Sequence, residues 1–138
     1  MGTRSTITFY ERHDEKQIPL VKIYQHFDGY ISGVGHELAK WLQSKTLVNG
    51  LPPSVHHNMA NGIGCLVAQF IHDFKTDPGG LYITSMSDIE EYNYHVFVDE
   101  YPFDPILAAD VTEIQVIDWN DNELFRGSPQ ELLNFKEK

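Results

Sequence analysis

Residues 63–74 constrain the fold most, because their apolar side chains recur at the spacing of an α-helix. They stand at offsets of 0, 3, 4, 7, 8 and 11 residues, on one side of a helix. They are Ile63, Leu66, Val67, Phe70, Ile71 and Phe74. This side must be covered by other elements, so it predicts a core helix that begins near Gly62. The Asp-Pro-Gly-Gly sequence at residues 77–80 ends that helix.

Most other periodic segments predict strands, because they are rich in β-branched and aromatic residues and partly alternate with polar ones. The predicted strands are residues 5–10, 20–27, 81–84, 92–98, 112–119 and 123–126. A further helix is predicted to begin near Gly35. Ser128, Pro129 and Glu131 form the pattern of a helix start, which predicts a short C-terminal helix to about Lys136.

The order of these elements defines the predicted fold class. Strands joined by short turns favour antiparallel pairing, and the helices must cover an apolar face. We therefore predict an α+β fold in two layers: a mostly antiparallel sheet of about six strands, with two central helices and a short C-terminal helix on one face. The 138 residues fit a single domain, residues 1–138.

Charge is unevenly distributed along the chain, whose formal net charge is −10. Residues 76–125 contain no Lys or Arg but hold most of the acids, namely Asp77, Asp88, Glu90, Glu91, Asp99, Glu100, Asp104, Asp110, Glu113, Asp118, Asp121 and Glu123. Such a segment repels phosphate backbones, so we expect no nucleic-acid partner. It is either a solvated acidic face or a surface that meets a basic protein.

Composition also bounds the compartment. No segment is long and apolar enough to span a membrane, and a single cysteine cannot form an internal disulfide. The N-terminus has no apolar signal region. These features predict a cytoplasmic protein without a membrane partner. Neither a cofactor nor a metal site is predicted, because the adjacent His56 and His57 lack the spacing of a helical metal pair.

Both internal helices are predicted to open from glycine-containing turns with polar neighbours. Helix starts of this kind expose amide protons and the positive end of the helix dipole, which suit a phosphate or a carboxylate. The alternative is that Asn61 caps its helix and the glycines permit close packing. The candidate ligand-binding residues are Arg4, Ser5, Asp28, Tyr30, Ser32, Gly33, Gly35, Asn61, Gly62 and Gly64.

Cys65 lies in the first turn of the predicted second helix. Unpaired amide protons and the helix dipole favour a thiolate at such a position. A nucleophile would also need a base, and several histidines are available at a distance in the chain. The alternative is a small residue packed under a neighbouring element.

Four short motifs resemble a family of small proteins from bacterial and bacteriophage genomes. They are GTRS at residues 2–5, DGYxSGxG at 28–35, NGxGC at 61–65 and PGGLY at 78–82. The resemblance covers residues 2 to about 95. It implies a shared fold and shared glycine and polar positions but lends no mechanism. The chain departs from the family in a longer turn between its first two strands, around residues 12–19. It also departs at Ile31, where the relatives carry proline.

The leading hypothesis is a non-enzymatic binding protein for a small anionic, nucleotide-derived ligand. By analogy with the phage setting, it would sequester that ligand as a counter-defence protein. A second hypothesis is an acidic decoy that inhibits a basic host protein through residues 88–123. A third is a cysteine-dependent hydrolase or transferase that uses Cys65. The sequence leaves open whether the chain forms a homo-oligomer.

Overall fold

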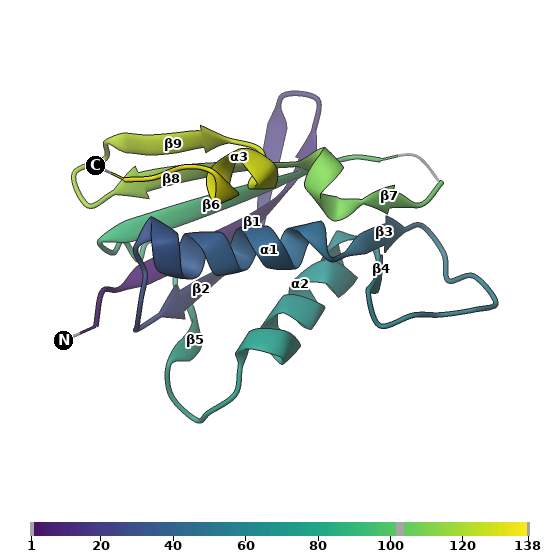
Figure 1. Ribbon diagram of the computed structural model, residues 1–138, viewed down its shortest axis with the longest axis horizontal. Coiled ribbons are helices and arrows are strands. Elements are labelled where there is room, and N and C mark those ends of the chain that lie inside the picture. Colours follow the sequence, from purple (N-terminus) through teal and green to yellow (C-terminus); the bar gives the residue numbers. More distant parts are fainter. Residues whose placement is uncertain (1, 102–103, 138) are drawn as a thin grey trace.

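The computed structural model describes residues 2–101 and 104–137 and contains a six-stranded sheet in the order β5-β2-β1-β6-β8-β9 (Figure 1). Its strands are β1 (Ser5–His13), β2 (Lys16–Gln25), β5 (Leu81–Thr84), β6 (Tyr92–Asp99), β8 (Thr112–Asp118) and β9 (Glu123–Gly127). β1 and β6 pair in parallel, and all other neighbours are antiparallel. The predicted fold class is confirmed.

Three α-helices pack on one face of this sheet. They are α1 (His36–Gln43), α2 (Gly62–Phe74) and α3 (Pro129–Leu133). Figure 1 shows α1 in front of the sheet, with α2 below it and α3 above. The apolar side of α2 reaches β1, since the ring centroids of Phe70 and Phe9 lie 5.3 Å apart. Trp41 of α1 packs edge-on against the same Phe70 at 5.2 Å.

A second, three-stranded sheet was not predicted. It consists of β3 (Thr46–Val48), β4 (Met59–Asn61) and β7 (Ile106–Leu107), in the order β4-β3-β7. Strands of two or three residues are too short for alternation to show in a sequence. In the chain, β3 and β4 lie between the end of α1 and the start of α2. Leu47 and Ala60, at the centre of this sheet, are fully buried.

Several element boundaries differ from the predictions. The first strand continues to His13 and the second already begins at Lys16 and ends at Gln25, so only the residues between His13 and Lys16 turn, with Asp14 at φ 54°. The C-terminal helix ends at Leu133 rather than near Lys136. Its predicted start is confirmed: Glu131 N donates to Ser128 Oγ and Ser128 N donates to Glu131 Oε1.

Alternation along the strands gives the main sheet two unlike faces. Ile7 and Phe9 of β1 point to the helices and are fully buried. The residues between and after them, Thr8 and Tyr10, point the other way, because successive side chains of a strand alternate. The face away from the helices is called the open face below. Among the described residues, no helix is long and apolar enough to cross a membrane.

The glycines of the turn before α1, residues 28–35, allow close packing against the sheet. This turn is called the first turn below. Gly29 N donates to Thr3 O at 2.9 Å, and a Cβ on Gly29 would lie 2.8 Å from the Cβ of Ser5. The buried Tyr94 hydroxyl donates to Gly29 O at 2.7 Å. A Cβ on Gly33 would lie only 2.3 Å from Asp28 O. Backbone atoms occupy the places where side chains would stand, so this turn needs glycine for steric reasons.

Replacing glycine in the two helix-start turns should therefore have opposite effects. Gly33→Ala should lower the free energy of unfolding by about 1–3 kcal/mol, because its Cβ meets the Asp28 carbonyl. Gly64→Ala should be neutral or stabilising by up to about 1 kcal/mol, since Gly64 lies in α2 with open space around it. Urea unfolding of both variants tests this. Equal stabilities would contradict the packing role of Gly33.

Candidate functional site

Among the described residues, the two glycine turns line different cavities. α1 begins at the left of Figure 1, after a π-helical turn (Ile31–Gly35), whereas α2 begins at the right beside β4. Gly33 lines one cavity together with Asp28 and Tyr30. Gly62 lines another, whose wall includes Glu11 and Glu100. Carboxylates therefore accompany both turns, which disfavours an anion at either one.

The amides of the first turn are already hydrogen-bonded. Val34 N donates to Asp28 O at 2.8 Å. Ile31 N donates to Glu137 Oε1 at 3.1 Å, and the other oxygen of Glu137 accepts from the Tyr92 hydroxyl at 2.8 Å. The carboxylate that this helix start binds thus belongs to the C-terminal segment of the same chain.

The remaining candidates near the first turn differ in exposure and in hydrogen bonding. The Arg4 side chain is exposed, and its backbone amide donates to Glu91 Oε1. Ser5 is fully buried, and its hydroxyl has no hydrogen-bond partner among the described residues. Ser32 is exposed, and Gly35 is buried against Tyr94. None of these four residues lines the cavity of Asp28, Tyr30 and Gly33.

In the second glycine turn, residues 61–64, the side chain of Asn61 binds the loop at residues 49–58. Asn61 Oδ1 accepts from Gly50 N at 2.8 Å, and its side chain makes no capping hydrogen bond to α2. Gly62 has φ 86°, a conformation that favours glycine. Gly64 is exposed. Asn61 thus occupies the N-cap position of α2 as suggested, but its side chain binds the loop at residues 49–58 instead of the helix amides.

Cys65 lies at a hollow of about 490 Å³ that His56 and His57 also line. Its thiol is partly exposed and free. The fold thus brings the only cysteine and the adjacent histidine pair together. Among the described residues, no group of three or more His, Cys, Asp or Glu has the arrangement of a metal site.

The acidic segment of residues 88–123, of which 102 and 103 lie outside the described residues, is partly neutralised by cations from other segments. Arg12 contacts two of its carboxylates at 2.5 and 2.7 Å. Arg126 contacts two at 3.5 and 3.8 Å. The paired acids are Asp99, Glu113 and Glu123. Fewer carboxylates are free for a basic partner than the sequence suggests.

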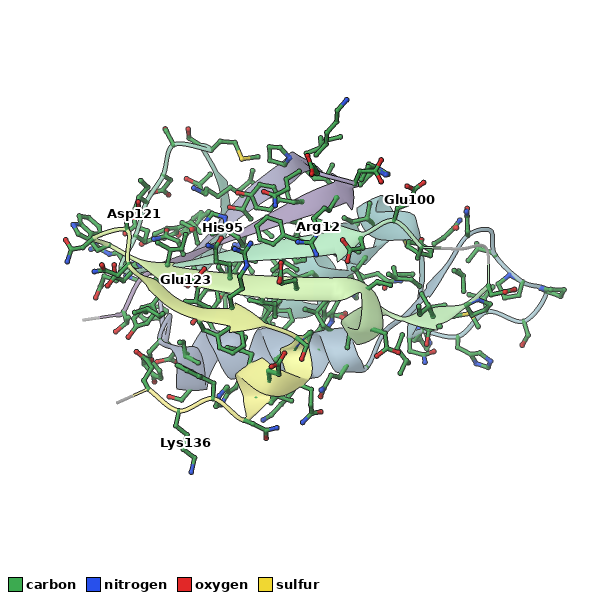
Figure 2. The ribbon with its side chains drawn as sticks, turned by 90° about the horizontal axis from the view of Figure 1, so that it is seen from above. Arg12, His95, Glu100, Asp121, Glu123 and Lys136 are labelled. Carbon is green, nitrogen blue, oxygen red and sulfur yellow. The ribbon has the colours of Figure 1, made fainter. Side chains whose placement is uncertain are left out.

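The most complete site lies on the open face, in a cavity of about 540 Å³ that we call the open-face cavity. Its floor comes from β1, β2 and β6, and its walls come from the end of β8 and from the loops that follow β5 and β8. The floor residues are Tyr10, Lys22, Asn93 and His95, and the wall residues include Met86, Ile89, Ile117, Trp119 and Asp121. Figure 2 shows His95 and Arg12 across the sheet from α1 and α3.

Strand register brings the polar floor together. Thr8 pairs laterally with Lys22 of β2 and with His95 of β6, so the three side chains stand in one row on the open face. Tyr10 follows Thr8 on the same face, and its hydroxyl and His95 Nδ1 share a hydrogen bond of 2.8 Å. The Thr8 hydroxyl is buried without a partner of hydrogen-bonding geometry among the described residues.

Each wall is held in place by hydrogen bonds from the sheet or within its own loop. Lys22 Nζ donates to the carbonyl oxygens of Met86 and Asp88, at 3.0 and 2.5 Å. On the opposite side, Asp118 Oδ1 accepts from two amides of its own turn, both at 2.9 Å. Those amides lower the pKa of Asp118. Trp119 remains 61% exposed at the edge of the cavity.

His95 is held neutral at physiological pH. Burial lowers its pKa to about 4, and the nearby charges of Lys22 and Arg126 act in the same direction. A neutral imidazole donates from one nitrogen and accepts at the other. Nδ1 is paired with Tyr10, while Nε2 has no partner among the described residues. Burial also raises the pKa of Tyr10, so both groups are uncharged hydrogen-bonding groups.

The sequence patterns did not reveal this site, although Asn93 and His95 alternate with the apolar residues of the strand predicted at residues 92–98. The missing information was the partner of each strand. β1 and β6 are separated by about eighty residues in the chain, and nothing in either segment specifies that they pair in parallel. With that pairing known, Thr8 and Tyr10 would have been placed beside His95.

Comparison with known proteins adds no family assignment. No protein-family model, no curated protein and no solved structure matches this chain. The site is therefore judged on its own geometry.

Neutral His95 should make stability depend on pH. Between its ordinary value of 6.5 and about 4, the unfolded chain binds a proton that the folded protein does not. Stability should therefore fall as pH falls through this window, by roughly 2 kcal/mol after allowance for partial exposure. Above pH 6.5 this contribution does not change.

Urea unfolding at pH 7.0 and 4.5 measures the effect. His95→Gln, which keeps a polar group near Tyr10 but does not titrate, should lose less stability than the wild type between these pH values. His72→Gln is the matched control, because the His72 side chain is 88% exposed. Equal losses for the wild type and His95→Gln would show that the burial of His95 is not linked to protonation.

Proposed function

We propose that the protein is a non-enzymatic binding protein whose open-face cavity takes a small, uncharged, planar ligand. The observation that supports this is the neutral His95, whose Nε2 has no partner among the described residues and which lines the same cavity as the exposed Trp119. A pocket with a few convergent polar groups, apolar walls and a strongly shifted pKa is typical of a ligand site.

The shape of the open-face cavity and its apolar walls favour a ligand with a flat ring. Trp119 stands at one wall and is 61% exposed; Met86 and Ile89 stand at the other and are about half-exposed. A flat ligand between them would stack on the indole and cover apolar surface that water now contacts. The volume of about 540 Å³ lies in the range of pockets for small organic ligands.

Charge favours an uncharged ligand over an anion at this site. Asp118 and Asp121 line the wall beside Trp119. The cation of the floor, Lys22, is buried and already donates to two carbonyl groups. His95 and Tyr10 offer neutral donors and acceptors instead. The edge of a nucleobase has this chemistry, which keeps the idea of a nucleotide-derived ligand while removing its phosphate. Sequestration of such a ligand in a phage setting stays a prediction.

Titration of the protein with free nucleobases and nucleosides tests the proposal. Calorimetry should find at least one ligand that binds the wild type. Trp119→Ala should bind it about tenfold more weakly or worse, because stacking of a base on an aromatic ring contributes about 1–3 kcal/mol. His95→Gln should also weaken it. Thermal unfolding of each variant checks that it remains folded.

Tyr82→Ala is the matched control. Tyr82 is an aromatic residue on the same face, 49% exposed, that does not line the cavity. Its loss should leave affinity within about twofold. The proposal is wrong if no compound of the panel binds, or if Trp119→Ala binds as tightly as the wild type.

The shared hollow of Cys65, His56 and His57 favours a second candidate function, a cysteine-dependent hydrolase or transferase. A histidine near the thiol would take its proton and raise its reactivity. Iodoacetamide should then alkylate Cys65 near neutral pH, and the double variant His56→Ala, His57→Ala should react several-fold more slowly. His72→Ala should react like the wild type. Absence of labelling, or labelling that is indifferent to the histidines, would argue for a merely packed thiol.

A further inference from the structure

A second cavity lies on the other side of the sheet, between the first glycine turn, α1 and the C-terminal half of α2. We call it the turn cavity. It measures about 250 Å³, which is smaller than the pockets of drug-sized ligands. Buried Ile7, Leu38 and Phe70 form its deep part. It shares none of its lining residues with the open-face cavity.

Aromatic rings form most of its outer wall. Phe74 stacks on Phe70 with ring centroids 4.4 Å apart, so α2 presents a continuous aromatic surface. Phe27 and Tyr30 stand on the turn opposite and are 59% and 38% exposed. Rings that line a cavity while open to solvent have faces available for a ligand.

Two carboxylates stand among these rings. Asp28 and Glu37 both line the turn cavity, and neither forms an ion pair with a Lys, Arg or His of the described residues. The Tyr30 hydroxyl donates to Asp28 Oδ1 at 3.1 Å. The hydrogen bond from Val34 N to Asp28 O holds the backbone of this residue in place. At least one carboxylate is therefore oriented beside the aromatic wall.

We propose that the turn cavity binds a small organic ammonium ion. An ammonium group is attracted by the negative faces of aromatic rings and by a nearby carboxylate, and its alkyl groups suit the apolar interior. Inorganic cations would gain little from the apolar interior, and an anion would be repelled by both acids. This site is independent of the proposed function, because it uses different residues on the opposite side of the sheet.

Choline and its uncharged isostere 3,3-dimethylbutan-1-ol are the probes, since they have nearly the same shape but differ in charge. NMR titrations in about 0.15 M salt should show binding of choline, with upfield shifts of its methyl protons from the ring currents of the wall. The isostere should bind at least about tenfold more weakly. Failure of choline to bind at tens of millimolar, or equal binding of the two probes, would overturn the proposal.

Single substitutions test whether choline binds in the turn cavity. Glu37→Gln and Phe74→Leu should each weaken choline binding several-fold, and circular dichroism should show that both remain folded. Glu15→Gln removes the same charge from the exposed first hairpin and should leave binding unchanged. Equal weakening by Glu15→Gln and Glu37→Gln would mean that only the net charge of the protein attracts choline, and would overturn the site.

Discussion

The parallel pairing of β1 with β6 is the constraint on which the rest of the structure depends. A parallel neighbour cannot be reached through a tight turn, so the chain must cross over the sheet between these strands. That crossover contains α1 and α2, which both lie on one face, and α3 later packs on the same side. In the part of the chain that the structure describes, no α-helix lies on the other face. The division into a helix-covered face and an open face thus follows from one strand pairing, and each face has its own cavity.

The same pairing explains why polar residues can gather at the centre of the sheet. β1 and β6 are inner strands, so their side chains on the open face are sheltered by neighbours on both sides even without a covering layer. Thr8 and His95 are adjacent there, and the loops after β5 and β8 rise on either side of them. Partial burial without a full cover keeps the imidazole neutral while leaving it accessible, which is the property that a hydrogen-bonding ligand site needs.

The glycine turns show how one sequence pattern is compatible with two roles. Glycine with polar neighbours at a helix start is typical of anion sites and equally of close packing. Here Gly29 and Gly33 lie against backbone atoms, and the amide of Ile31 binds the carboxylate of Glu137. The contact with Glu137, from a segment far away in the chain, occupies an amide that an anion would otherwise use. Asp28 and Tyr30 do line a cavity, but its acids suit a cation rather than an anion.

The sequence by itself determined the fold class, the strands of the main sheet and the three α-helices, but not the short strands of the second sheet. The apolar side of α2, the alternation in β6 and the capping residues of α3 are local patterns whose physical cause lies within a few residues, so they predicted these elements closely. The same alternation puts His95 on the side of its strand opposite Tyr94 and Val96. Only the tertiary structure decided that β6 pairs with β1, that His95 meets Tyr10, and that Cys65 lies near two histidines. These are contacts between segments that lie far apart in the chain. They depend on how the whole chain buries its apolar surface, and a local sequence pattern contains no information about that.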